Sequence, residues 1–168
     1  MKSFFSFPNP VNDAAARTVA SGVVIIAGLA LATGWAWLLV PLTYGFVARV
    51  LTGPTMSPLG QFALRVAAPR LKMWHKLVPG PPKRFAQGMG LVFSLTASIL
   101  YFTSGWVVAR WILVPLLGAA LLEAGLGVCL GCIIFGRLMS VGLIPETVCA
   151  ECADLPSYFA RKAQRTAV

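Results

Sequence analysis

The chain contains long stretches without a single charged side chain. Residues 18–48 form a run of 31 uncharged, mostly apolar residues, and residues 85–109 form a second run of 25. A straight helix of the first length would extend about 46 Å, whereas the hydrocarbon core of a bilayer is about 30 Å thick. Charged residues make up 11% of the chain, against about 25% in soluble domains, and the mean hydropathy is +0.79. These features exclude a soluble globule and predict an all-α membrane protein.

The first run is too long for one upright crossing and has two interpretations. It is either one tilted span or two short helices, about 18–32 and 35–51, joined by a tight turn at Thr33-Gly34-Trp35. We favour the turn, because a glycine beside a tryptophan suits an aromatic interface and leaves the flanking arginines on one side. The bundle then has four transmembrane helices. The single span would leave three.

The last apolar run, from Trp106 to about Leu138, is also longer than one crossing needs. A turn at Thr103-Ser104-Gly105 separates it from the preceding span. We therefore expect the last run to bend or to project beyond the lipid.

The segment between the second and third predicted helices is strongly basic. There is no acidic residue between Asp13 and Glu123, and seven of the 14 basic residues fall within residues 49–84. Such loops face the cytoplasm and anionic lipid, so the expected partner is the lipid bilayer and not nucleic acid. Within the loop, helical spacing from Leu59 predicts a short interfacial helix that ends at Pro69, and residues 78–85 are expected to form a stiff, proline-rich approach to the next span.

This orientation divides the chain into three parts. Residues 1–17 form a cytoplasmic N-terminal lead, residues 18–140 a transmembrane bundle that includes the basic loop 52–84, and residues 141–168 a cytoplasmic C-terminal segment. We expect a multi-pass protein of the inner (plasma) membrane with both termini in the cytoplasm.

The four cysteines form two CxxC pairs, separated by sixteen residues: Cys129, Cys132, Cys149 and Cys152. This spacing can bring four thiolates to one tetrahedral ion, which on the reducing cytoplasmic side favours zinc or iron. It equally suits a redox-active dithiol relay. A third interpretation is that the cysteines are small apolar side chains at a helix end.

Glu123 is an acidic residue inside a predicted span. A carboxylate there is costly unless it is paired or hydrated, which makes it a candidate functional residue. It either forms an ion pair with Arg49 or Arg84, or handles protons, or lies next to a metal site. At 1.5 Å per residue it lies about 25 Å along the helix from Trp106, in the inner half of the membrane.

Several motifs in a fixed order give the chain a family resemblance. They are Asn9-Pro-Val-Asn-Asp with Arg17, Arg49-Val-Leu-Thr-Gly-Pro, Ser57-Pro, Val78-Pro-Gly-Pro-Pro-Lys-Arg-Phe-Ala-Gln, and Leu122-Glu-Ala followed by both CxxC pairs. Together they span residues 9–154 and resemble the bacterial membrane family called domain of unknown function 4395. The resemblance implies a small multi-helix membrane protein, with relatives sometimes found beside thioredoxin-like or sulfurtransferase proteins, and it assigns no catalytic residue.

These observations favour a thiol-redox or sulfur-handling membrane protein that docks a soluble thioredoxin-like or sulfurtransferase partner. The alternative is a non-enzymatic membrane scaffold in which all four cysteines hold a structural zinc. A small transporter for a sulfur compound, coupled to protons through Glu123, is a third class. Metal content distinguishes the first two.

Overall fold

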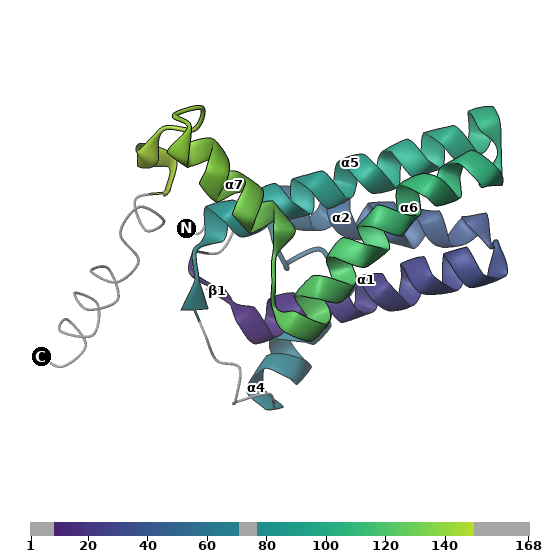
Figure 1. Cartoon of the computed structure of the whole chain (residues 1–168). Helices are drawn as coiled ribbons and strands as arrows, with labels where there is room; N and C mark the ends of the chain where they lie inside the picture. The colour runs from purple at the N-terminus through teal and green to yellow at the C-terminus, as the bar shows by residue number, and fades with distance from the viewer. Residues whose placement is uncertain (1–8, 71–76, 150–168) are drawn as a thin grey trace, which may run out of the picture.

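The computed structural model describes residues 9–70 and 77–149, and these residues form a helical bundle with short elements at one end (Figure 1). The predicted all-α fold class is confirmed for this part of the chain. The bundle has four helices: α1 (Asp13–Thr33), α2 (Leu39–Thr52), α5 (Gly80–Ser104) and α6 (Trp106–Leu121).

Shorter elements gather at the end of the bundle where α1 and α5 begin (Figure 1). They are β1 (Val11–Asn12), α3 (Pro58–Phe62), a π-helical turn (Ala63–Ala67), α4 (Ala68–Arg70), β2 (Leu77–Val78) and α7 (Leu130–Ser140). Strands β1 and β2 pair antiparallel, with Val11 opposite Val78, and so hold the starts of α1 and α5 together. The sequence did not predict this strand pair.

The first apolar run is divided by a turn where the sequence places one. Helix α1 ends at Gly34, whose φ of +72° is left-handed and whose N–H donates to Ala30. The Thr33 hydroxyl accepts a hydrogen bond from the N–H of Trp35, and a short 3-10 turn, Ala36–Leu38, leads into α2. The structure therefore contains two helices here and not one long helix.

The bundle core is small and apolar. Helices α1, α2, α5 and α6 contribute its buried side chains: Val23, Ala27, Leu39, Leu42, Phe46, Ala97, Leu113, Leu116 and Ala120. The α2–α5 contact is especially close, because a side chain at Gly90 would overlap the ring of Phe46. Small residues at this contact let the two helices approach, as is common in membrane bundles.

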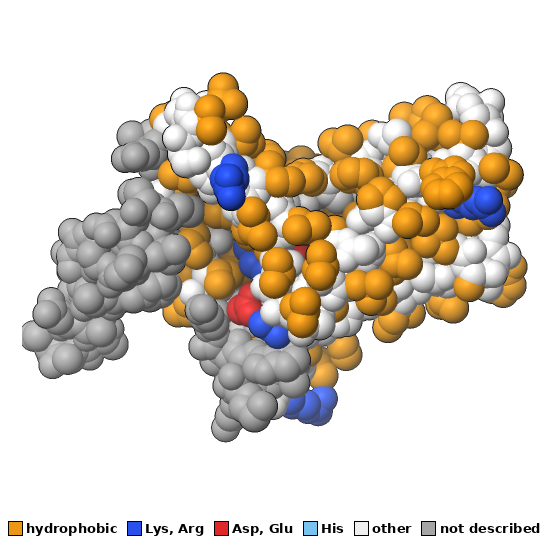
Figure 2. Space-filling view, in the orientation of Figure 1, with side chains coloured by type: hydrophobic (Ala, Val, Ile, Leu, Met, Phe, Trp, Pro, Cys, Tyr) orange, Lys and Arg blue, Asp and Glu red, His pale blue; other side chains and the backbone are white. Residues whose placement is uncertain are grey.

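Large apolar side chains also cover the outside of the bundle (Figure 2). Phe102, for example, is 85% exposed, and Trp111 is 66% exposed. Three helices of the described residues are long and apolar enough to cross a membrane, namely Asp13–Thr33, Gly80–Ser104 and Trp106–Leu126. The apolar helix Ala36–Thr52 is shorter. An exterior of this kind is stable in lipid, which together with the three long apolar helices suggests a membrane protein.

Two helix boundaries near the basic loop differ from the sequence prediction. The helical segment that starts at Pro58 continues through Pro69 to Arg70. In the preceding π-helical turn, each carbonyl accepts a hydrogen bond from the N–H five residues later. The helix can therefore continue past Pro69, which has no N–H to donate. Helix α5 begins at Gly80, before the predicted start at Phe85, because Pro81 and Pro82 occupy its first turn, where proline is well tolerated.

Candidate functional site

The helix of the last apolar run is interrupted just after α6, in agreement with the bend expected from the length of the run. A π-helical turn, Leu122–Leu126, follows α6 and ends at Gly127, which has a left-handed φ of +71°. The guanidinium group of Arg17 lies against Gly127, in space that any larger side chain would fill. Only glycine therefore suits this position, and the chain turns here to start α7 beside α5.

Helix α7 packs on the first turns of α5. The backbone at Gly131 lies so close to Ala86 that a side chain there would overlap it. Further along, the rings of Phe85 and Phe135 lie 5.6 Å apart, centroid to centroid. These contacts hold the start of α7, and with it the first CxxC pair, against α5.

Cys129 and Cys132 form a close dithiol at the start of α7. Cys129 is the N-cap residue, and its Sγ accepts a hydrogen bond of 3.3 Å from the N–H of Cys132. The Cys132 thiol donates a second hydrogen bond to the same sulfur, with the two Sγ atoms 2.7 Å apart. Both thiols are free, and Cys129 is buried. The structure thus places the first CxxC pair at the N-terminus of α7, with Cys129 as the cap residue.

These hydrogen bonds make the two thiols chemically unequal. The hydrogen bond from the Cys132 thiol, assisted by the charge of Lys83, lowers the pKa of Cys129 below its ordinary value. The same hydrogen bond and burial raise the pKa of Cys132. A lowered pKa at a helix N-terminus is typical of a nucleophilic cysteine. Cys129 is therefore the thiol of the pair that ionises more readily, and Cys132 is the hydrogen-bond donor.

A chain of ion pairs lies beside the dithiol, at the start of the bundle. Lys83 Nζ is 2.7 Å from Glu123 Oε1 and 3.5 Å from Asp13 Oδ1. Asp13 also pairs with Arg17, at 3.0 Å between Oδ2 and Nε. The Lys83 and Glu123 side chains are 7% and 15% exposed. The pairing offsets the cost of burying these charges.

Glu123 is thus paired, as one interpretation of the sequence expected, but its partner was predicted wrongly. Neither Arg49 nor Arg84 forms the pair, because Arg84 donates to the carbonyl of Val50 on the outside of α5. Lys83 takes this role because α5 begins at Gly80, which turns the lysine inward. Sequence reasoning missed Lys83 because it treated the Pro-Pro segment as non-helical.

Glu123 and Cys129 line one cavity of about 200 Å³ inside the bundle. Phe46, Met89 and Phe93 supply apolar walls, and Gln87 adds a polar group. Glu123 and Cys129 therefore border a common space, although they lie on different turns.

The predicted four-cysteine site extends beyond the described residues. Cys149 is buried at the end of a 3-10 turn, Glu146–Cys149, and is disulfide-bonded, whereas Cys152 lies outside the part of the chain that the structure describes. Within residues 9–70 and 77–149, no three His, Cys, Asp or Glu side chains gather where they could hold a metal ion. A zinc or iron site formed by all four cysteines stays a prediction.

Fold and site together define a helical membrane protein with a capped dithiol and a buried ion-pair chain at one end of the bundle. The chain belongs to the family described as Domain of unknown function (DUF4395), whose model matches residues 11–140. The match includes Cys129 and Cys132 and ends before Cys149 and Cys152. No curated protein and no solved structure matches the chain.

Proposed function

We propose that this chain is a membrane-bound thiol–disulfide exchange protein, with Cys129 and Cys132 as its redox-active dithiol. One observation carries the proposal: Cys129 caps α7 and receives two hydrogen bonds from Cys132, one from the N–H and one from the thiol. This arrangement stabilises a thiolate at Cys129. The proposed partner is a soluble thioredoxin-like or sulfurtransferase protein that carries a disulfide or persulfide.

The proposed exchange with a partner disulfide has two steps. The Cys129 thiolate attacks one partner sulfur and forms a mixed disulfide, and the other partner sulfur leaves as a thiolate. Cys132 then gives up its proton, attacks Cys129 Sγ and releases the partner. The partner disulfide is reduced by two electrons to a dithiol, and Cys129 and Cys132 are oxidised to a disulfide. The proton from Cys132 and one from solvent complete the partner thiols.

Thiol and metal content distinguish this function from the zinc scaffold. We expect chain purified in detergent without chelator to hold less than about 0.1 zinc or iron per chain, because the dithiol needs no ion. Elemental analysis measures the metal. A double variant, Cys149→Ser with Cys152→Ser, should still oxidise and be reduced reversibly at the remaining pair. One tightly held metal per chain, lost in the double variant, would show a structural metal site instead.

The proposed topology has four membrane spans: the three long apolar helices and, in addition, the shorter helix α2. The shared end of the bundle, where Arg17, Lys83 and Arg84 lie, faces the cytoplasm, since basic residues favour that side. The turns at Gly34 and Gly105 then lie outside, and both termini lie in the cytoplasm of a cell with the chain in its plasma membrane. This placement puts the dithiol in the reducing compartment that contains its proposed soluble partner.

Topology can be mapped with single cysteines in a variant whose four native cysteines are replaced by serine. We expect a cysteine at Ser104 to react in intact cells with a membrane-impermeant thiol reagent. A cysteine at Lys76 should react only after the membrane is opened. Labelling at Lys76 in intact cells would invert the orientation. External labelling at Ser3 would instead mean that α1 and α2 do not both cross.

A further inference from the structure

Arg49, near the end of α2, is a buried cation with an incomplete set of partners. Only 5% of the residue is exposed. Its Nε donates to Gln87 Oε1 at 2.8 Å, and Nη1 donates to Ser57 Oγ at 3.3 Å. The Phe46 ring stacks on the guanidinium at 4.7 Å. The remaining nitrogen, Nη2, is buried and has no hydrogen-bond partner. A guanidinium has five N–H donors, and here only part of them is used.

No carboxylate among the described residues forms an ion pair with Arg49, although the charge of Glu123 acts on it through space. The ion pairs among the described residues join Arg17 and Lys83 to Asp13 and Glu123, and none of them includes Arg49. Its hydrogen-bond partners, an amide oxygen and a hydroxyl, are neutral. A buried charge without a counter-charge is strongly unfavourable. The described residues therefore leave Arg49 without a negatively charged group in direct contact.

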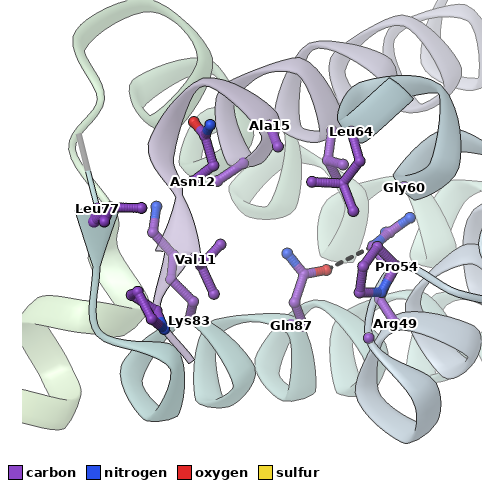
Figure 3. A pocket seen from close by; sticks show the side chains of 14 residues that line it. Val11, Asn12, Ala15, Arg49, Pro54, Gly60, Leu64, Leu77, Lys83 and Gln87 are labelled. Atoms are coloured by element: carbon purple, nitrogen blue, oxygen red, sulfur yellow. Dashed lines mark hydrogen bonds between the residues drawn. The ribbon is translucent and has the colours of Figure 1, made fainter. Parts of the chain in front are cut away.

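Arg49 also lines open space. A cavity of about 210 Å³ lies between the start of α1 and the first turns of α5, and Arg49, Lys83 and Gln87 are among its lining residues (Figure 3). Figure 3 shows the oxygen of Gln87 directed at Arg49 and the amide nitrogen of Gln87 directed into the cavity. A cavity of about 150 Å³ holds a benzene molecule, so there is room for a small ligand.

We propose that this cavity binds an oxyanion, of the phosphate or sulfate type, as the counter-charge of Arg49. A planar guanidinium recognises oxyanions with paired N–H donors, which favours this class over a halide. The Gln87 amide N–H₂ supplies a further donor from the cavity wall, and Lys83, which is paired with Glu123 and Asp13, also lines the cavity (Figure 3). The oxyanion is either a free ion or the phosphate of a lipid headgroup, because the cavity lies at the end of the bundle that carries the basic residues. The cavity shares Gln87 and Lys83 with the surroundings of the dithiol, but the proposed anion binding does not rest on the proposed function.

The thermal unfolding midpoint of the purified full chain tests this site. We expect sulfate or phosphate, or nanodiscs containing phosphatidylglycerol, to raise Tm by roughly 3–6 °C at ten times Kd, compared with chloride at equal ionic strength or with phosphatidylcholine nanodiscs. Stabilisation by the salts alone identifies a free ion, and stabilisation by the anionic lipid alone identifies a headgroup. If neither raises Tm above its neutral reference, the proposal is wrong.

Gln87→Glu gives the sharper test, because it places a carboxylate where an amide oxygen now accepts from Arg49. With the counter-charge supplied internally, Tm without oxyanion should rise and the oxyanion response should disappear. Arg49→Lys keeps the charge without the planar donors and should weaken the response at least tenfold in Kd. Arg110→Gln, at the other end of the bundle, is the control and should respond like wild type. An undiminished response in both Gln87→Glu and Arg49→Lys would overturn the assignment.

Discussion

Cys132→Ser is expected to stop thiol exchange at a mixed disulfide, whereas Cys129→Ser should form none. With 5,5′-dithiobis(2-nitrobenzoic acid) as the disulfide, the intact pair should release about two thionitrobenzoate anions per chain, because Cys132 displaces the second from Cys129. Cys132→Ser should release about one and retain the other covalently. Absorbance and intact mass measure these amounts, with Cys149 and Cys152 replaced by serine throughout.

The pH dependence of alkylation tests the same two cysteines in their reduced, thiol form. Since the hydrogen bond from Cys132 lowers the pKa of Cys129, Cys129 should react with iodoacetamide at neutral pH, below the range where an ordinary thiol ionises. Cys132→Ala removes that donor, so the pKa of Cys129 should rise and alkylation at neutral pH should slow. Equal alkylation of both thiols in the intact pair, or no change in Cys132→Ala, would contradict unequal roles.

Lys83→Met is expected to be the most damaging substitution in the bundle. It leaves Glu123 and Asp13 without the ammonium that now lies 2.7 and 3.5 Å from their oxygens. Breaking a buried ion pair from one side costs about 3–5 kcal/mol, which corresponds to a fall in Tm of about 6–20 °C for a chain of this size. Thermal unfolding in a fixed detergent measures the change.

Two variants make the Lys83 result specific. Arg84→Met removes the neighbouring but exposed cation and should change stability by no more than about 0.5 kcal/mol. Lys83→Met with Glu123→Gln removes both charges of the pair and should regain part of the lost stability. If Arg84→Met is as harmful as Lys83→Met, the effect is one of net charge and not of the ion pair.

Much of the architecture could be predicted because lipid imposes simple length limits. The run at residues 18–48 exceeded one upright crossing, and Gly34 was the one position in its centre that suited a turn. The run after Trp106 exceeded the same limit, and it breaks at Gly127. Glu123 had to be paired or hydrated, since an intramembrane carboxylate is otherwise too costly.

The details of the site depended on features that composition does not encode. A helix such as α6, in which Arg110 is the one charged residue, gives no periodic pattern from which an inner face can be assigned. The inward direction of Lys83 follows from the start of α5 at Gly80, because a shift of one residue rotates a helical side chain by about 100°. The burial of Arg49 follows from its contact with Gln87, which lies 38 positions away.

The two bundle turns have a consequence for how the chain enters a bilayer. The turn around Gly34 and the turn at Gly105 contain no charged residue, and Arg110 is the first charge after the second turn. Carrying an uncharged turn through hydrocarbon is far cheaper than carrying lysine or arginine, each of which costs about 2.5–3.5 kcal/mol at the centre of the membrane. In the proposed topology, α1 and α2 can therefore insert as a preformed hairpin, and α5 and α6 can insert as a second one with Arg110 as the one charge carried across. The ionic cluster then stays on the side on which the chain is made.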